Sequence, residues 1–388
     1  MATVPFNRAA LAGRELEYIR DAVASMHISG DGPFSHRCEA VLQTLLGAPR
    51  VLLTTSCTHA LEMAALLLDI QPGDEVVGPS FTFVSSFNAF VLRGATPVFA
   101  DVQPDTFNLD PASLERRLTP RTRAIVVMHY AGVGCDMDAI GAIAERRGIP
   151  IVEDNAHGLF GAWRGKPLGS FGRLATLSFH ETKNVTCGEG GALVVNDAAL
   201  AERAEILREK GTDRSKFFRG EVDKYTWHDV GSSYVPSEIL AAFLYAQLER
   251  RDEIQRRRLA HWHAYREALA PWAEATGVRL PIVPEGSDHP GHLFQVLLPT
   301  AAMRDAFLAH LHAHDVGAVF HYLPLHLSPM GRRFGGQPGD CPVTESVSER
   351  LVRLPLSGGL TGEEQQRVIA AVLAFAPVRH SGGAWRQC

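Results

Sequence analysis

The chain has 388 residues, of which 46% are hydrophobic and 21% are charged, and its formal net charge is −5. This length and composition fit a globular protein with one large and one smaller domain. The acidic balance argues against nucleic-acid binding as the main role, and no run of about 20 apolar residues could span a bilayer. The cysteines form no CxxC pair, and Asn7, Arg8 and Arg14 interrupt any apolar leader, so we expect a cytoplasmic protein.

Strand–helix units repeat along the first part of the chain, at residues 51–68, 75–92, 97–118 and 124–147. In the first unit the helix is expected over 60–68. A further apolar run at 149–154 completes a β-α-β rhythm, which is typical of a parallel sheet. Residues 210–227 are charged and aromatic without a period, which predicts a loop. The apolar stripe of 236–258 predicts one long helix.

We therefore expect a large domain over residues 1–250 and a small C-terminal domain over 251–377. The small domain has helical patterns at 260–269 and 300–314 and strand patterns at 293–298 and 318–322, which indicate an α+β unit. Residues 378–388 have little to anchor them and are expected to form a mobile tail. His310, His312 and His314 are interpreted as a solvated helix face rather than a metal site, because only His310 and His314 share a face.

A hydroxyl-rich turn joins the first strand to its helix and contains Ser56, Cys57 and Thr58. Backbone N–H groups at a helix N-terminus, with hydroxyls beside them, form an anion site that suits a phosphate. The same residue types also cap ordinary helices. Phe83 follows the second strand, where an aromatic ring could either stack on a flat ligand or pack in the core.

A lysine and an aspartate stand at the ends of later strands. Lys183 follows the apolar run 174–179 and is one of only five lysines among the 38 lysines and arginines. A partly desolvated lysine at such a turn can hold pyridoxal phosphate (PLP) as a Schiff base, whereas the alternative is a solvated turn lysine. Asp154 ends the run 149–154, where a carboxylate can pair with the pyridine nitrogen of PLP or simply cap a helix.

The chain resembles the sugar-nucleotide aminotransferases, on the segments TSCTHALE (55–62), PSFTF (79–83), EDNAH (153–157) and SFHETK (178–183). The resemblance runs from residue 5 to about residue 377. It is greatest to the TDP-4-oxo-6-deoxy-D-glucose 4-aminotransferases, which also share GSSY (231–234). It implies an α/β protein of PLP fold type I, like aspartate aminotransferase, with a mainly parallel sheet in the large domain and a smaller C-terminal α+β domain.

The resemblance also implies roles for individual residues. Lys183 matches the Schiff-base lysine, Asp154 the partner of the pyridine nitrogen, and Phe83 the aromatic that stacks on the ring. His157 stands where the family places a Gln or His against the ring. The implied phosphate contacts are Cys57, Thr58, Ser178 and, from a neighbouring subunit, Ser233, where many relatives have Asn. A loop with His321, Tyr322 and His326 is implied to reach the substrate.

The implied substrates are a TDP-sugar and L-glutamate, which leaves as 2-oxoglutarate, and the implied assembly is a homodimer with active sites between its subunits. The segment from Arg208 to Trp227 concentrates basic and aromatic side chains, among them Lys210, Lys216 and Arg219. We expect it to hold the diphosphate and thymine. A solvated basic loop is the alternative.

Other functions stay open from the sequence. One is a C3-aminotransferase of the same fold, and another is a PLP-binding regulator without catalysis. An NAD-dependent sugar-nucleotide oxidoreductase or epimerase would share the substrate, but no Gly-x-Gly-x-x-Gly opens a first strand–helix turn. The C4 configuration of the product, galacto or gluco, also remains open.

Overall fold

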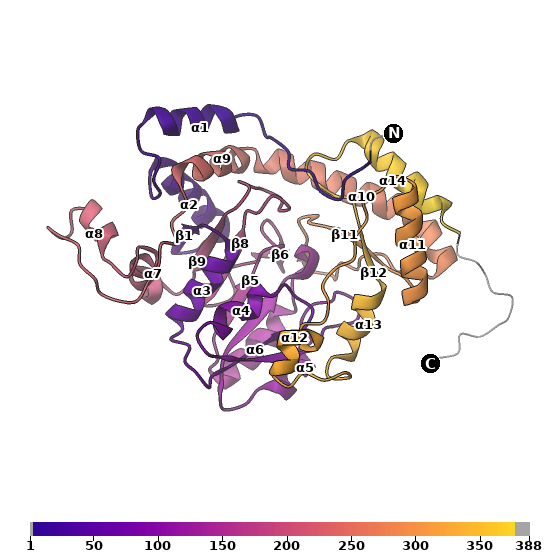
Figure 1. Cartoon of the computed structure of the whole chain (residues 1–388), viewed down its shortest axis with the longest axis horizontal. Helices are drawn as coiled ribbons and strands as arrows, with labels where there is room; N and C mark the ends of the chain where they lie inside the picture. Colours follow the sequence, from indigo (N-terminus) through magenta and orange to yellow (C-terminus); the bar gives the residue numbers. More distant parts are fainter. Residues whose placement is uncertain (1–2, 377–388) are drawn as a thin grey trace.

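The computed structural model describes residues 3–376, and a mainly parallel sheet forms its centre (Figure 1). Within these residues the sheet has seven strands in the order β1-β9-β8-β5-β4-β2-β3, and β9 alone runs antiparallel to its neighbours. The strands are β1 (Arg50–Thr54), β2 (Glu75–Pro79), β3 (Thr96–Ala100), β4 (Thr122–Met128), β5 (Ile151–Asp154), β8 (Leu174–Ser178) and β9 (Gly191–Val195). The expected fold class is confirmed.

Helices cover both faces of the sheet because its strands are apolar on both sides. In β4, Ala124 and Val126 face a cluster with α3 (Cys57–Leu67) and α4 (Ser85–Val91), whereas Ile125 and Val127 face α5 (Pro111–Arg117) and α6 (Met137–Arg147). The helices α1 (Glu15–Ala24), α2 (Pro33–Leu46) and α9 (Glu238–Glu249) pack on β1, β8 and β9. The predicted strand–helix units are all present.

The parallel direction brings four chain segments to one edge of the sheet. β1, β5 and β8 end there at Thr54, Asp154 and Ser178, and β9 begins there at Gly191. Gly191 is the register partner of both Thr54 and Ser178. The hydroxyl-rich turn, the strand-end aspartate and the lysine segment therefore meet at the carboxyl ends of the strands.

The C-terminal part has its own apolar core. Its cluster is drawn from residues 262–375, and Val4 joins it through a bridge to Val316. The elements are α10 (Arg251–Thr276), β11 (Phe294–Leu297), α11 (Ala301–Ala313), α13 (Pro342–Arg350), β12 (Leu351–Leu354) and α14 (Gly362–Ala374). A second cluster, with Phe81, Tyr130 and Leu351, joins this part to the sheet. The proposed boundary at 250/251 falls between α9 and α10.

Several boundaries differ from the sequence-based expectations. The helix expected over 236–258 is two helices, because Arg250 leaves the helical conformation at φ −102°, ψ 13°. The strand expected over 318–322 reduces to a single bridge between Val319 and Arg353. The helix expected from residue 60 begins at Cys57, since the side chain of Ser56 caps it. The loop 210–227 contains α8 (Arg214–Phe218). The tail 378–388 lies outside the described residues.

Shorter elements complete the fold. They are α7 (Ala201–Arg208), α12 (Pro329–Arg333), β6 (Ala162–Trp163), β7 (Lys166–Pro167) and β10 (Ser287–Asp288). No helix within residues 3–376 is long and apolar enough to cross a membrane.

The close approach of β9 to the start of α3 yields a stability prediction. A Cβ atom added at Gly191 would lie 2.3 Å from the carbonyl carbon of Ser56 and 2.4 Å from the backbone nitrogen of Cys57. We predict that Gly191→Ala lowers the free energy of unfolding by about 1–3 kcal/mol, as overpacking does elsewhere. Urea unfolding followed by circular dichroism measures the change.

Gly141→Ala is the matched control, because Gly141 lies inside α6 with nothing within 4 Å of its added Cβ atom. That variant should gain up to about 1 kcal/mol from helix propensity. Equal stability of Gly191→Ala and the wild type would contradict the tight contact.

Candidate active site

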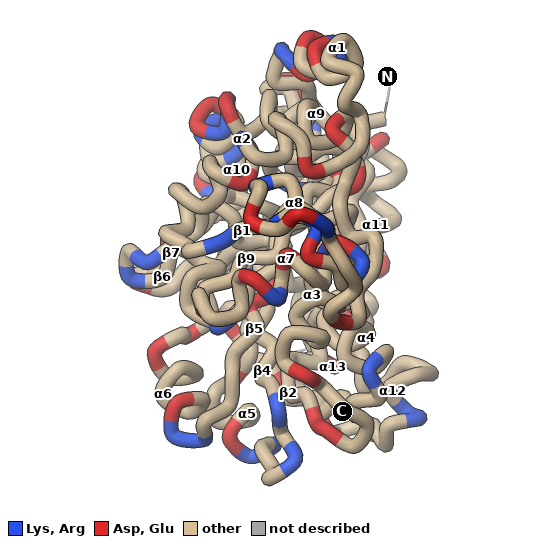
Figure 2. Tube along the Cα trace, turned by 90° about the vertical axis from the view of Figure 1, so that its left-hand side faces the viewer, with Lys and Arg blue, Asp and Glu red and all other residues tan. Residues whose placement is uncertain are grey.

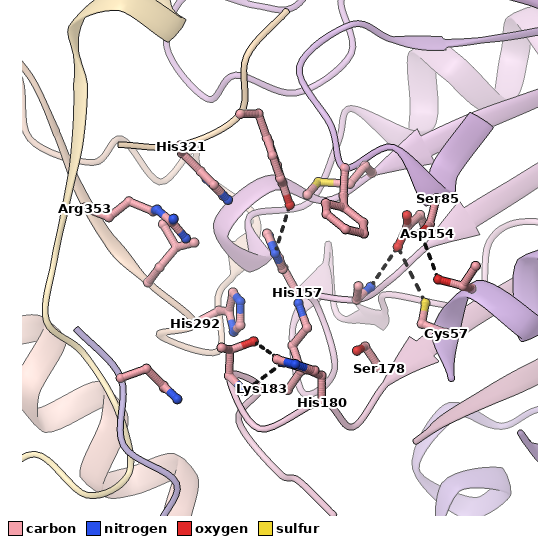
Figure 3. Close-up of a pocket in the computed structure, with 18 of the residues that line it drawn as sticks. Cys57, Ser85, Asp154, His157, Ser178, His180, Lys183, His292, His321 and Arg353 are labelled. Atoms are coloured by element: carbon pink, nitrogen blue, oxygen red, sulfur yellow. Dashed lines mark hydrogen bonds between the residues drawn. The ribbon is translucent and has the colours of Figure 1, made fainter. Parts of the chain in front are cut away.

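A cavity of about 820 Å³ lies at the carboxyl edge of the sheet, between the sheet and the C-terminal part. Its lining includes every strand-end residue that the sequence singled out (Figure 3). The lining residues with polar or charged side chains, together with Phe83, are Asn7, Ser56, Cys57, Thr58, Phe83, Ser85, Asp154, His157, Ser178, His180, Thr182, Lys183, Glu189, His292, His321, Tyr322 and Arg353. The fold thus collects residues from positions 7 to 353 around one space.

Asp154 carries the buried negative charge of this cavity, with a relative exposure of 4%. Its carboxylate accepts hydrogen bonds from Ser86 Oγ at 2.5 Å and from the Ala156 backbone N–H at 3.2 Å. Burial raises the pKa of Asp154 because few partners compensate for lost water. A cationic ring nitrogen placed against it would stabilise the ionised form.

The N-terminus of α3 forms a second polar wall. Ser56 Oγ accepts the His59 N–H at 3.1 Å, and Thr58 Oγ1 lies 2.8 Å from Ser85 Oγ. No residue of the described chain accepts a hydrogen bond from the backbone N–H of Cys57 or Thr58. Free N–H groups at a helix N-terminus that lines a cavity suit a phosphate, and Ser178 lies beside them.

Lys183 reaches the same cavity from the turn that follows β8. Burial lowers the pKa of Lys183 and Arg353 lowers it further, while Cys57 and Asp154 oppose the change. Among the described residues, none accepts a hydrogen bond from Lys183 Nζ. A lysine with a lowered pKa and a free amine is a nucleophile toward carbonyl carbon.

Histidine and tyrosine rings form a stacked array above this lysine. His157 stacks on His292 with ring centroids 4.2 Å apart, and its Nε2 lies 3.4 Å from the Tyr322 hydroxyl. His321 stacks on Tyr322 at 3.7 Å. Burial lowers the pKa of His157, His292 and His321 well below the usual value, so the rings are neutral near pH 7. The Nδ1 atom of His157 is buried without a partner, as expected where a ligand completes the site.

The remaining predicted residues divide into two groups. Phe83 lines the cavity with 55% of its surface exposed, so it is available for stacking and is not a core residue. His326 does not line it: its Nδ1 lies 2.6 Å from Ser80 Oγ and its Nε2 lies 3.0 Å from Glu345 Oε1. His326 is fully buried, and both of its ring nitrogens bond to the protein. It therefore does not reach the substrate space, contrary to what the resemblance implied.

Neither the basic segment nor Ser233 lines the cavity of its own chain, as far as residues 3–376 describe it. Lys210 pairs with Glu209 at 3.1 Å, Lys216 with Glu202 at 2.5 Å, and Arg219 with Glu205 at 2.9 Å. Figure 2 shows basic and acidic residues interleaved around α7 and α8. Arg208 was expected to belong to a nucleotide-binding loop, but it is 1% exposed and pairs with Asp31 and Glu39 inside the fold.

Several lining residues were not predicted from the sequence, and His292 and Arg353 are the two that come from the C-terminal part with nitrogen atoms in their side chains. His292 precedes β11, and its Nδ1–H donates to Asn184 Oδ1 at 2.8 Å. Arg353 interrupts the apolar strand β12, which was not predicted. The arginine within the otherwise apolar segment LVRL (351–354) was the sequence signal that could have indicated a site residue here. No group of His, Cys, Asp or Glu suited to a metal occurs in the described part of the chain.

These residues fit PLP. The orphaned His157 Nδ1, the buried Asp154, the free N–H groups of α3 and the free amine of Lys183 each meet one part of that cofactor. The fold and this set of side chains define an aminotransferase of PLP fold type I. Residues 10–373 match the DegT/DnrJ/EryC1/StrS aminotransferase family, and the chain belongs to it.

Relatives of known structure or role agree with this membership. The chain is 31% identical over 377 residues to the spore coat polysaccharide biosynthesis protein SpsC of Bacillus subtilis (strain 168), covering 95% of this chain and 96% of SpsC. DesV of S. venezuelae, solved in complex with a ketimine intermediate, is 33% identical with a TM-score of 0.87, covering 96% of this chain and 98% of DesV.

Spr1654 of Streptococcus pneumoniae in its PLP-form is 26% identical with a TM-score of 0.88, covering 95% of this chain and 97% of Spr1654. A PMP-form of Spr1654 is also known, and the family uses PLP. The protein is therefore a PLP-dependent sugar aminotransferase. The alternatives of a nicotinamide-dependent oxidoreductase and of a non-catalytic regulator are wrong.

The buried neutral histidines predict how stability depends on pH. Their pKa values are lowered in the folded protein, so below about pH 6.5 the unfolded chain binds protons that the folded chain does not. The free energy of unfolding should therefore fall as the pH drops from about 6.5, with each such histidine contributing about 1.4 kcal/mol per pH unit. Urea midpoints at pH 7.5 and 5.5 measure this loss.

His292→Gln removes one of these titrating groups and keeps a hydrogen-bonding group for Asn184. The loss of stability on acidification should be smaller in this variant. His27→Gln is the control, because His27 is exposed and its replacement should leave the pH dependence unchanged. The same slope in His292→Gln and in the wild type would contradict a neutral, buried His292.

Proposed function

We propose that the protein transfers the amino group of L-glutamate to C4 of TDP-4-oxo-6-deoxy-D-glucose. The observation that carries the transamination is the meeting of Lys183, Asp154 and the unpartnered His157 Nδ1 in one cavity. The C4 position is supported by the resemblance of the segments HETK (180–183) and GSSY (231–234) to the 4-aminotransferases. A C3-aminotransferase of a related nucleotide sugar is the second candidate.

The residues of this cavity would divide the work as follows. When bound, PLP delocalises the electron pair that remains when a proton leaves the donor carbon. Asp154 would hold the proton on the pyridine nitrogen, His157 Nδ1 would bond a substituent of the ring, and Phe83 would be available to stack on it. The N-terminus of α3 and Ser178 would bind the phosphate.

Lys183 would move the protons. Its lowered pKa leaves a larger share of neutral amine near pH 7 than an exposed lysine has. Nζ can therefore take the proton from Cα of glutamate, which leaves as 2-oxoglutarate, and deliver a proton to C4 of the sugar in the second half-reaction. The stacked neutral rings around it exclude water without adding charge.

We also propose that the protein acts as a homodimer in the cytoplasm. Ser233, Lys210 and Arg219 are exposed, and so are the large apolar side chains of Leu92, Phe218 and Trp227, at 65%, 64% and 77%. Exposed apolar groups that gather into one patch mark an interaction surface. On this hypothesis, Ser233 reaches the phosphate of the partner's cofactor, and Lys210, Lys216 and Arg219 face its nucleotide.

Replacement of Lys183 tests the central role. We predict that Lys183→Ala lowers turnover of glutamate and the TDP-sugar by several orders of magnitude, since both the covalent link and the proton transfer are lost. It should also lose the visible absorption band that PLP shows when linked to the wild-type enzyme.

Lys166→Ala serves as the control, because Lys166 lies on the exposed strand β7 and should keep full turnover. Retention of most activity in Lys183→Ala would reject the assignment.

The proposed nucleotide role of the basic segment gives a separate prediction. Lys216→Gln should raise the Michaelis constant for the TDP-sugar about tenfold and leave the glutamate half-reaction unchanged, because glutamate carries no diphosphate. Both half-reactions are measured in stopped flow by the loss or recovery of PLP absorption. Equal constants for Lys216→Gln and the wild type would mean that this segment is solvated and idle.

Product analysis tests the position and configuration. Two-dimensional NMR of the purified product locates the carbon that carries nitrogen, and the H3–H4 coupling separates the galacto from the gluco configuration. Nitrogen at C3 would replace the first candidate with the second.

A further inference from the structure

Arg353 enters the cavity because of its register in β12. Successive side chains of a strand point to opposite faces. Val352 and Leu354 belong to the core of the C-terminal part, whereas Leu351 packs in the cluster with Phe81 and Tyr130. Arg353 shares the face of Leu351 and lies opposite Gln295 of β11. Figure 3 shows its guanidinium group directed into the cavity, on the side of His321 and across from Asp154.

The protein holds this guanidinium in place without neutralising it. Nε and Nη2 donate to the Phe320 carbonyl oxygen at 3.2 and 2.9 Å, and the Phe6 ring lies 4.6 Å from the guanidinium carbon. Within residues 3–376, no acidic side chain forms an ion pair with Arg353, and Nη1 has no hydrogen-bond acceptor. Arg353 is half-buried. A charge partly withdrawn from water without a counter-ion is unfavourable, so an arginine at this position indicates a ligand that supplies the counter-ion.

The cavity around Arg353 favours an anion. Arg353 is the single arginine, and Lys183 the single lysine, among the described lining residues. Asp154 and Glu189 are the acidic ones, and Asp154 would pair with the cofactor ring. Arg353 also acts electrostatically on Lys183, His157 and His321. It is therefore close to the place where bonds to the substrate change.

We propose that Arg353 binds a carboxylate of the amino-acid donor and thereby positions its Cα against Lys183. This inference rests on the proposed function, which requires a glutamate donor. A carboxylate accepts two parallel hydrogen bonds from a guanidinium fork, which lysine cannot supply. The donor α-carboxylate is one bond from the reacting carbon, whereas the diphosphate of the sugar nucleotide lies across the hexose ring from C4. Closeness to Lys183 therefore favours the donor.

Direct binding tests the inference without turnover. Glutarate is an inert dicarboxylate that cannot react with the cofactor, and its affinity for the PLP-loaded enzyme is measured by calorimetry. We predict that Arg353→Gln weakens glutarate binding about 10- to 100-fold and that Arg353→Lys recovers part of it. Arg350→Gln is the control, because Arg350 ends α13 next to β12 and does not line the cavity. Its affinity should equal that of the wild type.

The two half-reactions identify the ligand. In Arg353→Gln the apparent dissociation constant for L-glutamate should rise by a similar factor, while the reaction of the pyridoxamine form with the TDP-oxosugar stays at the wild-type value. Loss in the sugar half-reaction alone, or an equal loss in both, would overturn the inference. So would equal glutarate affinity in Arg353→Gln and the wild type, or no glutarate binding by the wild type.

A failure of the proposed function is seen separately. If the wild-type enzyme forms no aminated sugar from glutamate, the donor or acceptor has been misassigned, whatever Arg353 does. If the wild type turns over normally and Arg353→Gln binds glutarate normally, only the role of Arg353 is lost. Circular dichroism and thermal melting of both Arg353 variants exclude unfolding as the cause of a weaker affinity.

Discussion

The buried carboxylate of Asp154 is the constraint on which the arrangement of the cavity depends. Its neighbour Glu153 points to the opposite side of β5, where the backbone N–H groups of Gly169, Phe171 and Gly172 donate to it at 2.6–2.8 Å. These bonds hold the end of the strand in place. Asp154 itself has fewer partners, so burial raises its pKa and these partners offset the shift only in part. A cationic group bound against it is therefore stabilised, and the other walls of the cavity are arranged around the space where such a group would sit.

Neutral aromatic rings and one guanidinium complete the cavity from the C-terminal side. Stacked histidines and tyrosines are polar enough to bond a ligand, yet their shifted pKa values keep them uncharged. Apart from histidines, the charged residues of the described cavity lining are Lys183, Asp154, Arg353 and the exposed Glu189. Because Asp154 is buried and Lys183 and Arg353 are partly buried, these charges act on one another more strongly than they would in water. Transamination requires such control, since a proton must pass between carbon and nitrogen without loss to solvent.

The basic segment shows why a count of charges does not define a site. Lys216 and Arg219 are attractive candidates for a diphosphate, but both already pair with glutamates of α7. Exposed pairs of this kind contribute little to stability and exchange partners readily. A nucleotide bound to a neighbouring subunit can therefore compete with these glutamates for Lys216 and Arg219. Such a nucleotide site would belong to the assembly and not to the single chain. Arg208, by contrast, is committed to the interior by its two acidic partners.

The sequence by itself determined the alternating strands and helices, the position of Lys183 after one strand and of Asp154 at the end of another. These features depend on local periodicity and on short segments such as EDNAH and SFHETK, so they can be read without knowing which elements meet. The break at Arg250, the burial of His326 and the entry of His292 and Arg353 into the cavity were decided by the tertiary structure. Each depends on contacts between distant segments: β12 must pair with β11 before Arg353 can face the cavity, and Ser80 and Glu345 must enclose His326 before its nitrogens are occupied. Burial and the resulting pKa shifts arise only when such segments pack together, which local sequence patterns do not specify.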